Sequence, residues 1–201
     1  RLRNGTLERQ TGRESLYATQ PEAAEPVPTE ARREEPVMTL RGVGWRAGGR
    51  SILEGVDLNI FRGERLLLLG DNGCGKTSLL RLMARLARPT AGEIRQFIDP
   101  ALGQRRGSRA WFRRVGVVYQ NPNCQLFMPT VAQEVAFAAK SEGFAREIME
   151  LFDIMHLSER HPHSLSEGQK RRVSIAAVAA SQPELLLLDE HTAALDPKTA
   201  D

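Results

Sequence analysis

Residues 70–78 have the composition of a loop that holds phosphate groups. They read Gly-Asp-Asn-Gly-Cys-Gly-Lys-Thr-Ser and match the pattern G-x-x-x-x-G-K-[ST]. The glycines let successive backbone N–H groups turn toward an anion, and the helix expected next points its partly positive N-terminus at the same anion. We therefore expect the phosphates of a nucleotide to bind here, with the Lys76 ammonium on the β- and γ-phosphates and the Thr77 hydroxyl on Mg²⁺. The expected nucleotide-binding residues of the loop are Gly70, Asp71, Asn72, Gly73, Cys74, Gly75, Lys76, Thr77 and Ser78.

Two neighbouring carboxylates, Asp189 and Glu190, follow a run of four leucines at 185–188. Such a run is typical of a buried strand, and open α/β sheets place ligand chemistry at the carboxyl ends of their strands. Asp189 is placed to hold Mg²⁺ through its water shell, and Glu190 could polarise the attacking water as general base. Two solvated acids at a strand end would be the simpler interpretation if they stood alone. The phosphate loop in the same chain favours the catalytic interpretation.

A third segment, Leu-Ser-Glu-Gly-Gln at 165–169, stands directly before an evident helix. The small hydroxyl of Ser166 and the absence of a side chain at Gly168 would permit an anion to approach the helix N-terminus closely. The segment could thus form a second anion-binding surface. Taken alone, an ordinary serine-capped helix start is the favoured interpretation.

The elements that must position these residues alternate between strand and helix patterns. Short apolar runs between glycine turns predict strands at 38–43, 52–60, 65–69, 93–97 and 115–119. Apolar residues at three- and four-residue spacing after the loop predict a helix that ends near Arg88, because Pro89 cannot continue it. Thr130 and Gln133 have the capping-box form of a helix start, and spacing over 148–155 predicts an amphipathic helix. The pattern indicates an α/β domain with a helical insert.

Composition limits the chain to one α/β domain and a tail. Its 201 residues are too few for two complete domains of this kind. The 28 basic and 25 acidic residues nearly cancel, so a nucleic-acid partner is not required. No apolar stretch approaches the length of a membrane span, and two cysteines do not suggest a disulfide framework.

We infer the domain boundaries from the change of residue composition along the chain. Residues 1–37 are rich in charged residues and proline, and we expect a linker or disordered tail there. Residues 38–201 form the expected folded domain, with a helical subdomain roughly at 121–170. The chain starts without methionine and stops at what looks like a helix start, so we expect the natural protein to continue at its C-terminus.

In their order, the motifs resemble those of the ATP-binding cassette (ABC) ATPases, over roughly residues 38–201. Residues 70–78 look like the Walker A loop, 165–169 like the signature motif and 185–190 like the Walker B strand. Gln120 is similar to the Q-loop glutamine and Asp196 to the D-loop aspartate. The implied fold is that of an α/β P-loop NTPase of the ABC type, with a mixed sheet core and a helical subdomain, the C-terminal part being missing.

The resemblance also implies roles for individual residues. Gln120 would contribute to catalysis and to the Mg²⁺ site, and Asp196 would lie at the nucleotide. Ser166, Gly168 and Gln169 would contact the γ-phosphate held by the Walker A loop of a partner subunit, which makes a head-to-tail dimer the working unit. Trp45 stands about where the family has its adenine-stacking aromatic, and a core tryptophan is an equally good interpretation.

Within the family, residues 118–127 are similar to the energy-coupling factor (ECF) ATPases of bacterial and archaeal vitamin and metal-ion importers, which carry a Q-N-P-x-x-Q-L-F segment. This resemblance implies that ATP hydrolysis by two ATPase subunits or halves drives substrate uptake. The implied partners are a transmembrane coupling protein and a membrane substrate-binding protein, with the ATPases at the cytoplasmic face of the membrane. The tail before residue 38 is also similar to the junction of a tandem ATPase.

Two other functions stay open at this point. The first is a soluble ABC ATPase acting on DNA or ribosomes, which would be expected to carry zinc-binding or coiled-coil insertions that the sequence does not show. The second is a nucleotide-binding regulatory half with little turnover. Glu167, which stands where the family signature most often has its first glycine, keeps this second alternative open, as do the short helical insert and the switch histidine that this sequence does not reach.

Overall fold

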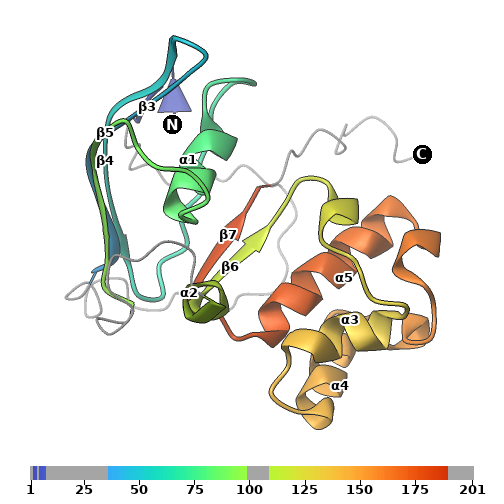
Figure 1. Cartoon of the computed structure of the whole chain (residues 1–201). Helices are drawn as coiled ribbons and strands as arrows, with labels where there is room; N and C mark the ends of the chain where they lie inside the picture. Colours follow the sequence, from blue (N-terminus) through green and yellow to red (C-terminus); the bar gives the residue numbers. More distant parts are fainter. Residues whose placement is uncertain (1, 4, 8–35, 99–108, 190–201) are drawn as a thin grey trace, which may run out of the picture. The chain divides into compact units, whose positions relative to one another are not determined.

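The structure is a computed structural model that describes residues 2–3, 5–7, 36–98 and 109–189 (Figure 1). The chain divides into two compact units, Arg1–Gln104 (unit 1) and Arg105–Asp201 (unit 2). The boundary between residues 37 and 38 and the subdomain at 121–170 stay predictions from the sequence.

Unit 1 is built on an antiparallel sheet with the order β4-β3-β5. Its strands are β3 (Pro36–Ala47), β4 (Arg50–Phe61) and β5 (Ala91–Gln96), which confirms the strands predicted in these three regions. Gly48 and Gly49 join β3 to β4 with φ angles of 56° and 75°. A two-residue hairpin loop with positive φ at both positions matches the twist of its strands, and glycine adopts it without strain.

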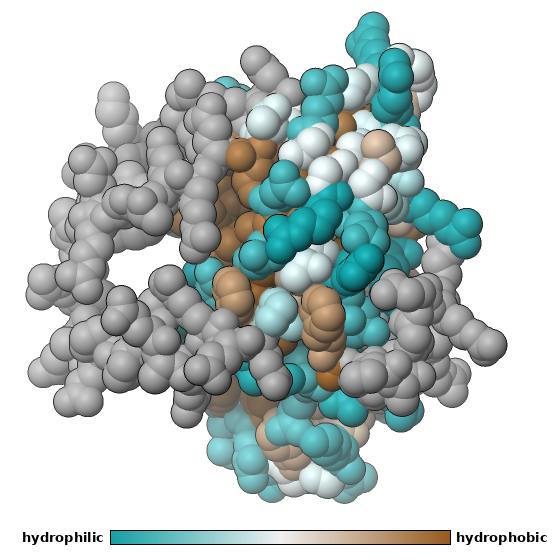
Figure 2. Space-filling view, turned by 90° about the vertical axis from the view of Figure 1, so that its left-hand side faces the viewer, coloured by the Kyte–Doolittle hydropathy of each residue, from teal (hydrophilic) through white to brown (hydrophobic). Residues whose placement is uncertain are grey.

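The core of unit 1 consists of apolar side chains from this sheet and from helix α1 (Lys76–Met83). Its buried apolar side chains are Leu2, Val37, Met38, Leu40, Val43, Leu53, Val56, Ile60, Leu79, Leu82, Met83, Ala84 and Ile98. Figure 2 views the molecule from the side on which Figure 1 draws the sheet, and hydrophilic and apolar side chains are mixed on this face. An example of hydrophilic side chains on the sheet is the exposed ion pair of Arg95 and Glu93 on β5, whose N–O distance is 2.9 Å.

The first residues of the chain belong to unit 1 rather than to a tail. β1 (Leu2–Arg3) and β2 (Thr6–Leu7) pair antiparallel with each other. The N–H of Leu2 donates to the carbonyl of Leu69 at 2.6 Å, and the Leu2 side chain is fully buried. Residues 2–3 and 5–7 thus gain backbone pairing and apolar burial within unit 1. The linker or disordered tail expected over residues 1–37 stays a prediction, because residues 8–35 lie outside the described residues.

Unit 2 contains a parallel strand pair joined by a helical crossover. The strands are β6 (Val115–Val118), as predicted, and β7 (Leu185–Leu188). Parallel strands need a long connection between them, and the one here includes α3 (Val131–Ala138), α4 (Glu142–Leu151) and α5 (Glu167–Ala180). Figure 1 shows α3 and α4 packed beside α5.

Shorter helical segments complete unit 2. α2 (Arg109–Arg114) leads into β6 and buries Trp111 completely. Single 3-10 turns are η2 (Pro122–Cys124), η3 (Met155–Leu157) and η4 (Pro162–Ser164).

Helices α3, α4 and α5 of unit 2 begin at side-chain caps and enclose one apolar cluster. Thr130 caps α3 as predicted, with its hydroxyl accepting from the N–H of Gln133 at 3.2 Å. Ser141 caps α4 in the same way through the N–H of Phe144 at 3.2 Å. The buried cluster consists of Leu126, Val131, Val135, Ala145, Ile148, Met149, Ile154, Leu157, Leu165, Val173, Ala176 and Ala180.

Three local predictions differ from the structure. The helix expected over 148–155 is α4, which ends at Leu151 and is followed by Asp153 with a left-handed φ of 51°. Residues 65–69 do not form a regular strand, and Leu67 is 73% exposed, because within the described residues of unit 1 only an isolated bridge between Leu2 and Gly70 adjoins this run. Helix α1 ends at Met83 rather than near Arg88. Arg85 has a φ of 58°, a left-handed conformation that terminates the helix before Pro89 is reached.

Candidate functional site

The phosphate loop at 70–78 folds around the side chain of Lys76. The Lys76 Nζ donates to the carbonyl oxygens of Gly70 at 2.7 Å and Asp71 at 2.8 Å, and lies 3.8 Å from the Cys74 Sγ. The half-buried lysine thus lies along the inside of the loop, with its charge held by backbone carbonyls. An anion within the loop would meet a cation that is already in position.

Two glycines of the loop are required by close packing. An added Cβ at Gly75 would stand 2.8 Å from Leu53 Cδ2, and the φ of 102° at this residue is one that other residues rarely adopt. An added Cβ at Gly70 would stand 2.6 Å from the Cys74 Sγ and closer still to the Leu2 carbonyl. The pattern of the loop therefore reflects both its curvature and its contact with β4 and β1.

The N-terminus of α1 is suited to an anion. Gly75 precedes the helix without a side-chain cap, and the first turn contains no acidic residue. The first N–H groups of a helix need acceptors from outside it, and their partial positive charge favours phosphate. The residues present therefore fit the triphosphate of a nucleotide. Thr77 and Ser78 lie half-buried in the first turn, where Thr77 could also reach Mg²⁺.

Trp45 lies on the part of the sheet that packs against this loop. It is half-buried on β3 and pairs directly with Leu53 on β4. Directly opposed residues of an antiparallel pair share a face, and Leu53 is the residue that packs against Gly75. Trp45 is thus on the loop side of the hairpin, which suits a base-stacking role without excluding a packing role.

The start of α5 forms a complete capping box. The Ser166 hydroxyl accepts from the Gln169 N–H at 3.4 Å, and the Gln169 Oε1 accepts from the Ser166 N–H at 3.1 Å. Glu167 pairs instead with Lys170 at 2.9 Å, while an added Cβ at Gly168 would meet nothing within 4 Å. The backbone at Gly168 is therefore open to approach, and the carboxylate charge of Glu167 is balanced by its own neighbour.

The carboxyl ends of β6 and β7 bring Gln120 and Asp189 to one edge. Val118 pairs with Leu188 in the parallel register, and the Asp189 N–H continues the ladder to the Val118 carbonyl at 2.9 Å. Asp189 is half-buried, whereas Gln120 is exposed just beyond β6. An acid and an amide at neighbouring strand ends are suitable ligands for Mg²⁺ and its waters.

The remaining predicted residues, Glu190 and Asp196, lie outside the described residues. The phosphate loop and Trp45 belong to unit 1, whereas Gln120, Asp189 and the start of α5 belong to unit 2. That residues of both groups act on nucleotide in one assembly stays a prediction from the sequence.

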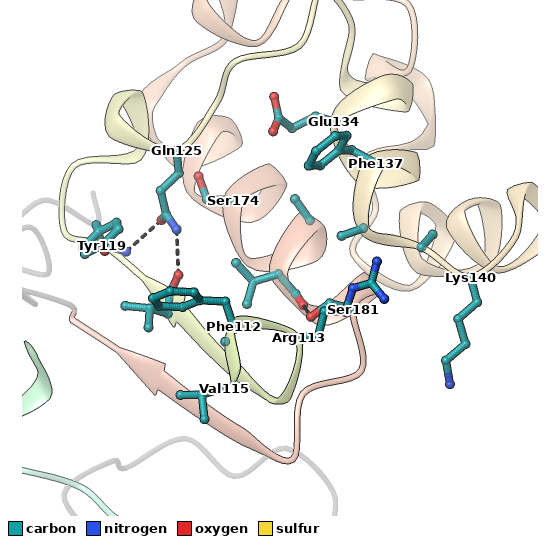
Figure 3. A pocket seen from close by; sticks show the side chains of 16 residues that line it. Phe112, Arg113, Val115, Tyr119, Gln125, Glu134, Phe137, Lys140, Ser174 and Ser181 are labelled. Carbon is teal, nitrogen blue, oxygen red and sulfur yellow. Dashed lines mark hydrogen bonds between the residues drawn. The ribbon is translucent and has the colours of Figure 1, made fainter. Parts of the chain in front are cut away.

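Sequence reasoning missed two side chains that hold the segment after β6. Gln125 and Glu134 hydrogen-bond to the backbone of residues 117–128 and line a cavity of about 830 Å³ in unit 2 (Figure 3). The second glutamine of the Q-N-P-x-x-Q-L-F segment was visible in the sequence. The hydrogen-bond partners of this glutamine were not visible in the sequence, because they depend on how the loop after β6 turns back toward that strand.

Cys74 offers a chemical probe of the loop. Bound ATP should protect its thiol from an alkylating reagent, because the thiol lies beside the Lys76 ammonium inside the expected cradle. At an ATP concentration about ten times Kd, labelling should slow about tenfold, since only unoccupied protein reacts. Cys124 is an exposed free cysteine in unit 2, so Cys124→Ser removes its contribution to the labelling. Equal labelling of Cys74 with and without ATP would contradict its placement in the loop.

None of the described helices has both the length and the apolar character that crossing a membrane requires.

Comparison with known proteins places these features in a family. The family model described as ABC transporter matches residues 53–193. The nickel import ATP-binding protein NikO of Rhodobacter capsulatus is 42% identical over 83% of this chain and 70% of its own length. The energy-coupling factor transporter ATP-binding protein EcfA of Methanothermobacter thermautotrophicus is 37% identical over 76% of this chain and 52% of its own length.

A solved structure shows the same fold. The cbiO1 protein of Clostridium perfringens, described as part of the ABC transporter complex cbiONQ, superposes with a TM-score of 0.66 at 33% identity, covering 82% of this chain and 69% of that one. The chain spans 58% of the length of a putative ABC transporter ATP-binding protein of Methanocaldococcus jannaschii, to which it is 40% identical over 75% of its residues. The motifs, the fold and these relatives together show that the chain belongs to the ABC transporter family and has the P-loop ATPase fold of its ATP-binding proteins.

Proposed function

We propose that this chain is the ATP-binding and ATP-hydrolysing part of an importer of the energy-coupling factor type, which takes up a vitamin or a transition-metal ion. The observation that carries the proposal is the Lys76 side chain held inside a glycine loop, directly before a helix whose N-terminus has no side-chain cap. The names of the NikO and EcfA relatives support the importer class.

In this proposal unit 1 binds the triphosphate. The Lys76 ammonium exchanges the carbonyls of Gly70 and Asp71 for the β- and γ-phosphates, and the first N–H groups of α1 hold the same charge. The Thr77 hydroxyl holds Mg²⁺, which when bound neutralises charge on the phosphates. Trp45 supplies a flat face for the adenine ring.

Unit 2 supplies the groups that act on the γ-phosphate. Asp189 and Gln120 orient water and the metal at the edge of β6 and β7, and Glu190 takes a proton from the attacking water as general base. Ser166, Gly168 and Gln169 contact the γ-phosphate on the loop of a second ATPase subunit or half. Asp196 lies at the same junction. Two such chains in head-to-tail contact thus complete two sites.

The proposed partners lie in the membrane. Three apolar side chains of unit 2 are strongly exposed, at 75% for Phe127, 77% for Phe137 and 76% for Leu151. Exposed large apolar side chains favour a protein contact. They support a transmembrane coupling protein as partner, with a separate membrane substrate-binding protein, and hence a peripheral position at the cytoplasmic face of the membrane. The cbiO1 structure, described as part of a cbiONQ complex, supports the same arrangement.

Two serine-capped helices of unit 2 provide the test. Ser166→Ala and Ser141→Ala each remove an N-cap, which costs about 1 kcal/mol of stability. Only Ser166→Ala also removes the proposed γ-phosphate contact, so turnover should fall about 100-fold in this variant and change little in Ser141→Ala. ATPase rates are measured on the full-length protein reconstituted with its membrane components.

Equal effects of the two substitutions would contradict a role for the start of α5 in hydrolysis. Retained ATP binding with no turnover in the wild type would instead favour the nucleotide-binding regulatory half.

A further inference from the structure

The segment that carries Gln120 is tied to β6 by one side chain. The Gln125 Oε1 accepts from the N–H of Tyr119 at 2.8 Å, and the Gln125 Nε2 donates to the carbonyl of Val117 at 2.6 Å. Both bonds are to backbone groups at the carboxyl end of β6, and Tyr119 directly precedes Gln120. The amide of Gln125 therefore acts as a strand neighbour at this point and fixes the direction in which the chain leaves β6.

The far end of the same segment is held by a buried carboxylate. Glu134 on α3 is only 6% exposed, and its Oε2 accepts from the N–H groups of Phe127 and Met128 at 2.7 Å each. We call the hydrogen bonds made by the Gln125 side chain and those made by the Glu134 side chain the two tethers. Leu126, which lies between them in the sequence, is 1% exposed and belongs to the apolar cluster of unit 2. Hydrogen bonds to an ionised acceptor are stronger than those between neutral groups, so this tether is firm.

The space beside the segment is not filled by packing. Tyr119, Gln125 and Glu134 line the cavity of about 830 Å³, together with Ser174 of α5 (Figure 3). The Ser174 hydroxyl is buried and has no hydrogen-bond partner among the described residues. The side of the segment that borders this cavity has no packed neighbour there, so the two tethers contribute to its position together with the burial of Leu126.

We infer that Gln125 and Glu134 are positioning residues that hold residues 119–128 so that Gln120 can reach the metal–nucleotide complex. The inference rests on the proposed function for the role of Gln120, whereas the tethers themselves are features of the structure. Gln125 acts on the backbone next to Gln120, and Glu134 prevents the other end of the segment from moving into the cavity.

Hydrogen–deuterium exchange of the full-length protein without nucleotide tests the tethers. Gln125→Glu keeps the size and the acceptor but replaces the donor to Val117 by a carboxylate oxygen, and Glu134→Gln removes the charge that holds two N–H groups. Peptides that cover 119–128 should exchange about tenfold faster in both variants. Gln133→Glu, an exposed position on α3 next to Glu134, is the matched control and should leave exchange unchanged.

The Mg²⁺ dependence of ATP binding, measured by equilibrium dialysis, tests positioning. The half-saturating Mg²⁺ concentration should rise about tenfold in Gln125→Glu and Glu134→Gln, as expected when a metal-contacting residue is displaced, and stay unchanged in Gln133→Glu. Unchanged hydrogen exchange at 119–128 in both variants would overturn the claim that the two tethers hold this segment. Faster exchange with an unchanged Mg²⁺ requirement would show a merely structural role and overturn positioning.

The dialysis measurement does not depend on turnover, so the two proposals can fail separately. A wild-type protein that binds ATP with Mg²⁺ and does not hydrolyse it would overturn the proposed ATPase function while the shift in Mg²⁺ dependence still decides positioning. A wild-type protein that binds no ATP would overturn both.

Discussion

Lys76→Ala should weaken ATP binding about 10- to 100-fold and lower turnover at least as much. The Lys76 Nζ holds two loop carbonyls at 2.7 and 2.8 Å without nucleotide, so its charge is already in the position where phosphates are expected. Hydrogen bonds to charged groups contribute about 1.5–3 kcal/mol, and each 1.4 kcal/mol is tenfold in affinity. Isothermal titration of the full-length protein with ATP measures the change.

The stability of the nucleotide-free protein should respond less to this substitution. The carbonyl of Asp71, which Lys76 releases, belongs to an exposed residue and can bond water instead. Lys140→Ala is the matched control, because Lys140 is an exposed lysine of unit 2 that bonds Gln182. Equal affinity of the Lys76 variant and the wild type for ATP would show that the loop at 70–78 does not hold the phosphates.

Features set by neighbouring residues could be predicted from the sequence. The glycine spacing at 70–78, the serine cap at Ser166 and the threonine cap at Thr130 all involve residues within a few positions of each other. The φ angles that glycine alone adopts easily and the hydroxyl that accepts an N–H three residues on are local properties. The structure confirms these elements for the same physical reason.

Features set by distant partners could not be predicted. Leu66–Leu69 has the apolar composition of a buried strand, but a strand also needs neighbours in a ladder, and the sequence does not say which segment supplies them. Leu2 is the opposite case, in which composition predicts too little pairing. Its segment has the composition of a tail, yet pairing with Leu69 and full burial place it in unit 1.

The tethers of the Gln120 segment combine both kinds of information. Gln125 is visible as part of a motif, but its role depends on backbone groups of Val117 and Tyr119 that the turn brings beside it. Glu134 is an acid in the first turn of α3, where a helix N-terminus already favours negative charge. Only the tertiary path of the chain shows that its carboxylate also holds Phe127 and Met128.

Glu190→Gln should abolish most turnover, by about 100-fold or more, while ATP binding stays close to that of the wild type. The residue itself lies outside the described residues, and the strand that precedes it is β7. Leu185 and Leu187 are buried, and the ladder with β6 extends through the Asp189 N–H. In the sequence, position 190 comes two residues after the last residue of this parallel strand, and we expect a carboxylate there to take a proton from water at a bound phosphate. An amide of the same size cannot accept this proton.

A glutamate at the opposite end of the same strand provides the control. Glu184 directly precedes β7 and pairs with Arg114, with their side chains 17% and 48% exposed. Glu184→Gln likewise replaces one carboxylate by an amide of the same size, and the amide can still accept a hydrogen bond from Arg114. Turnover should therefore change less than about twofold in Glu184→Gln. If both substitutions reduce turnover equally, the loss at Glu190 reflects damage to the strand. If only Glu190→Gln does so and ATP still binds, Glu190 is the general base.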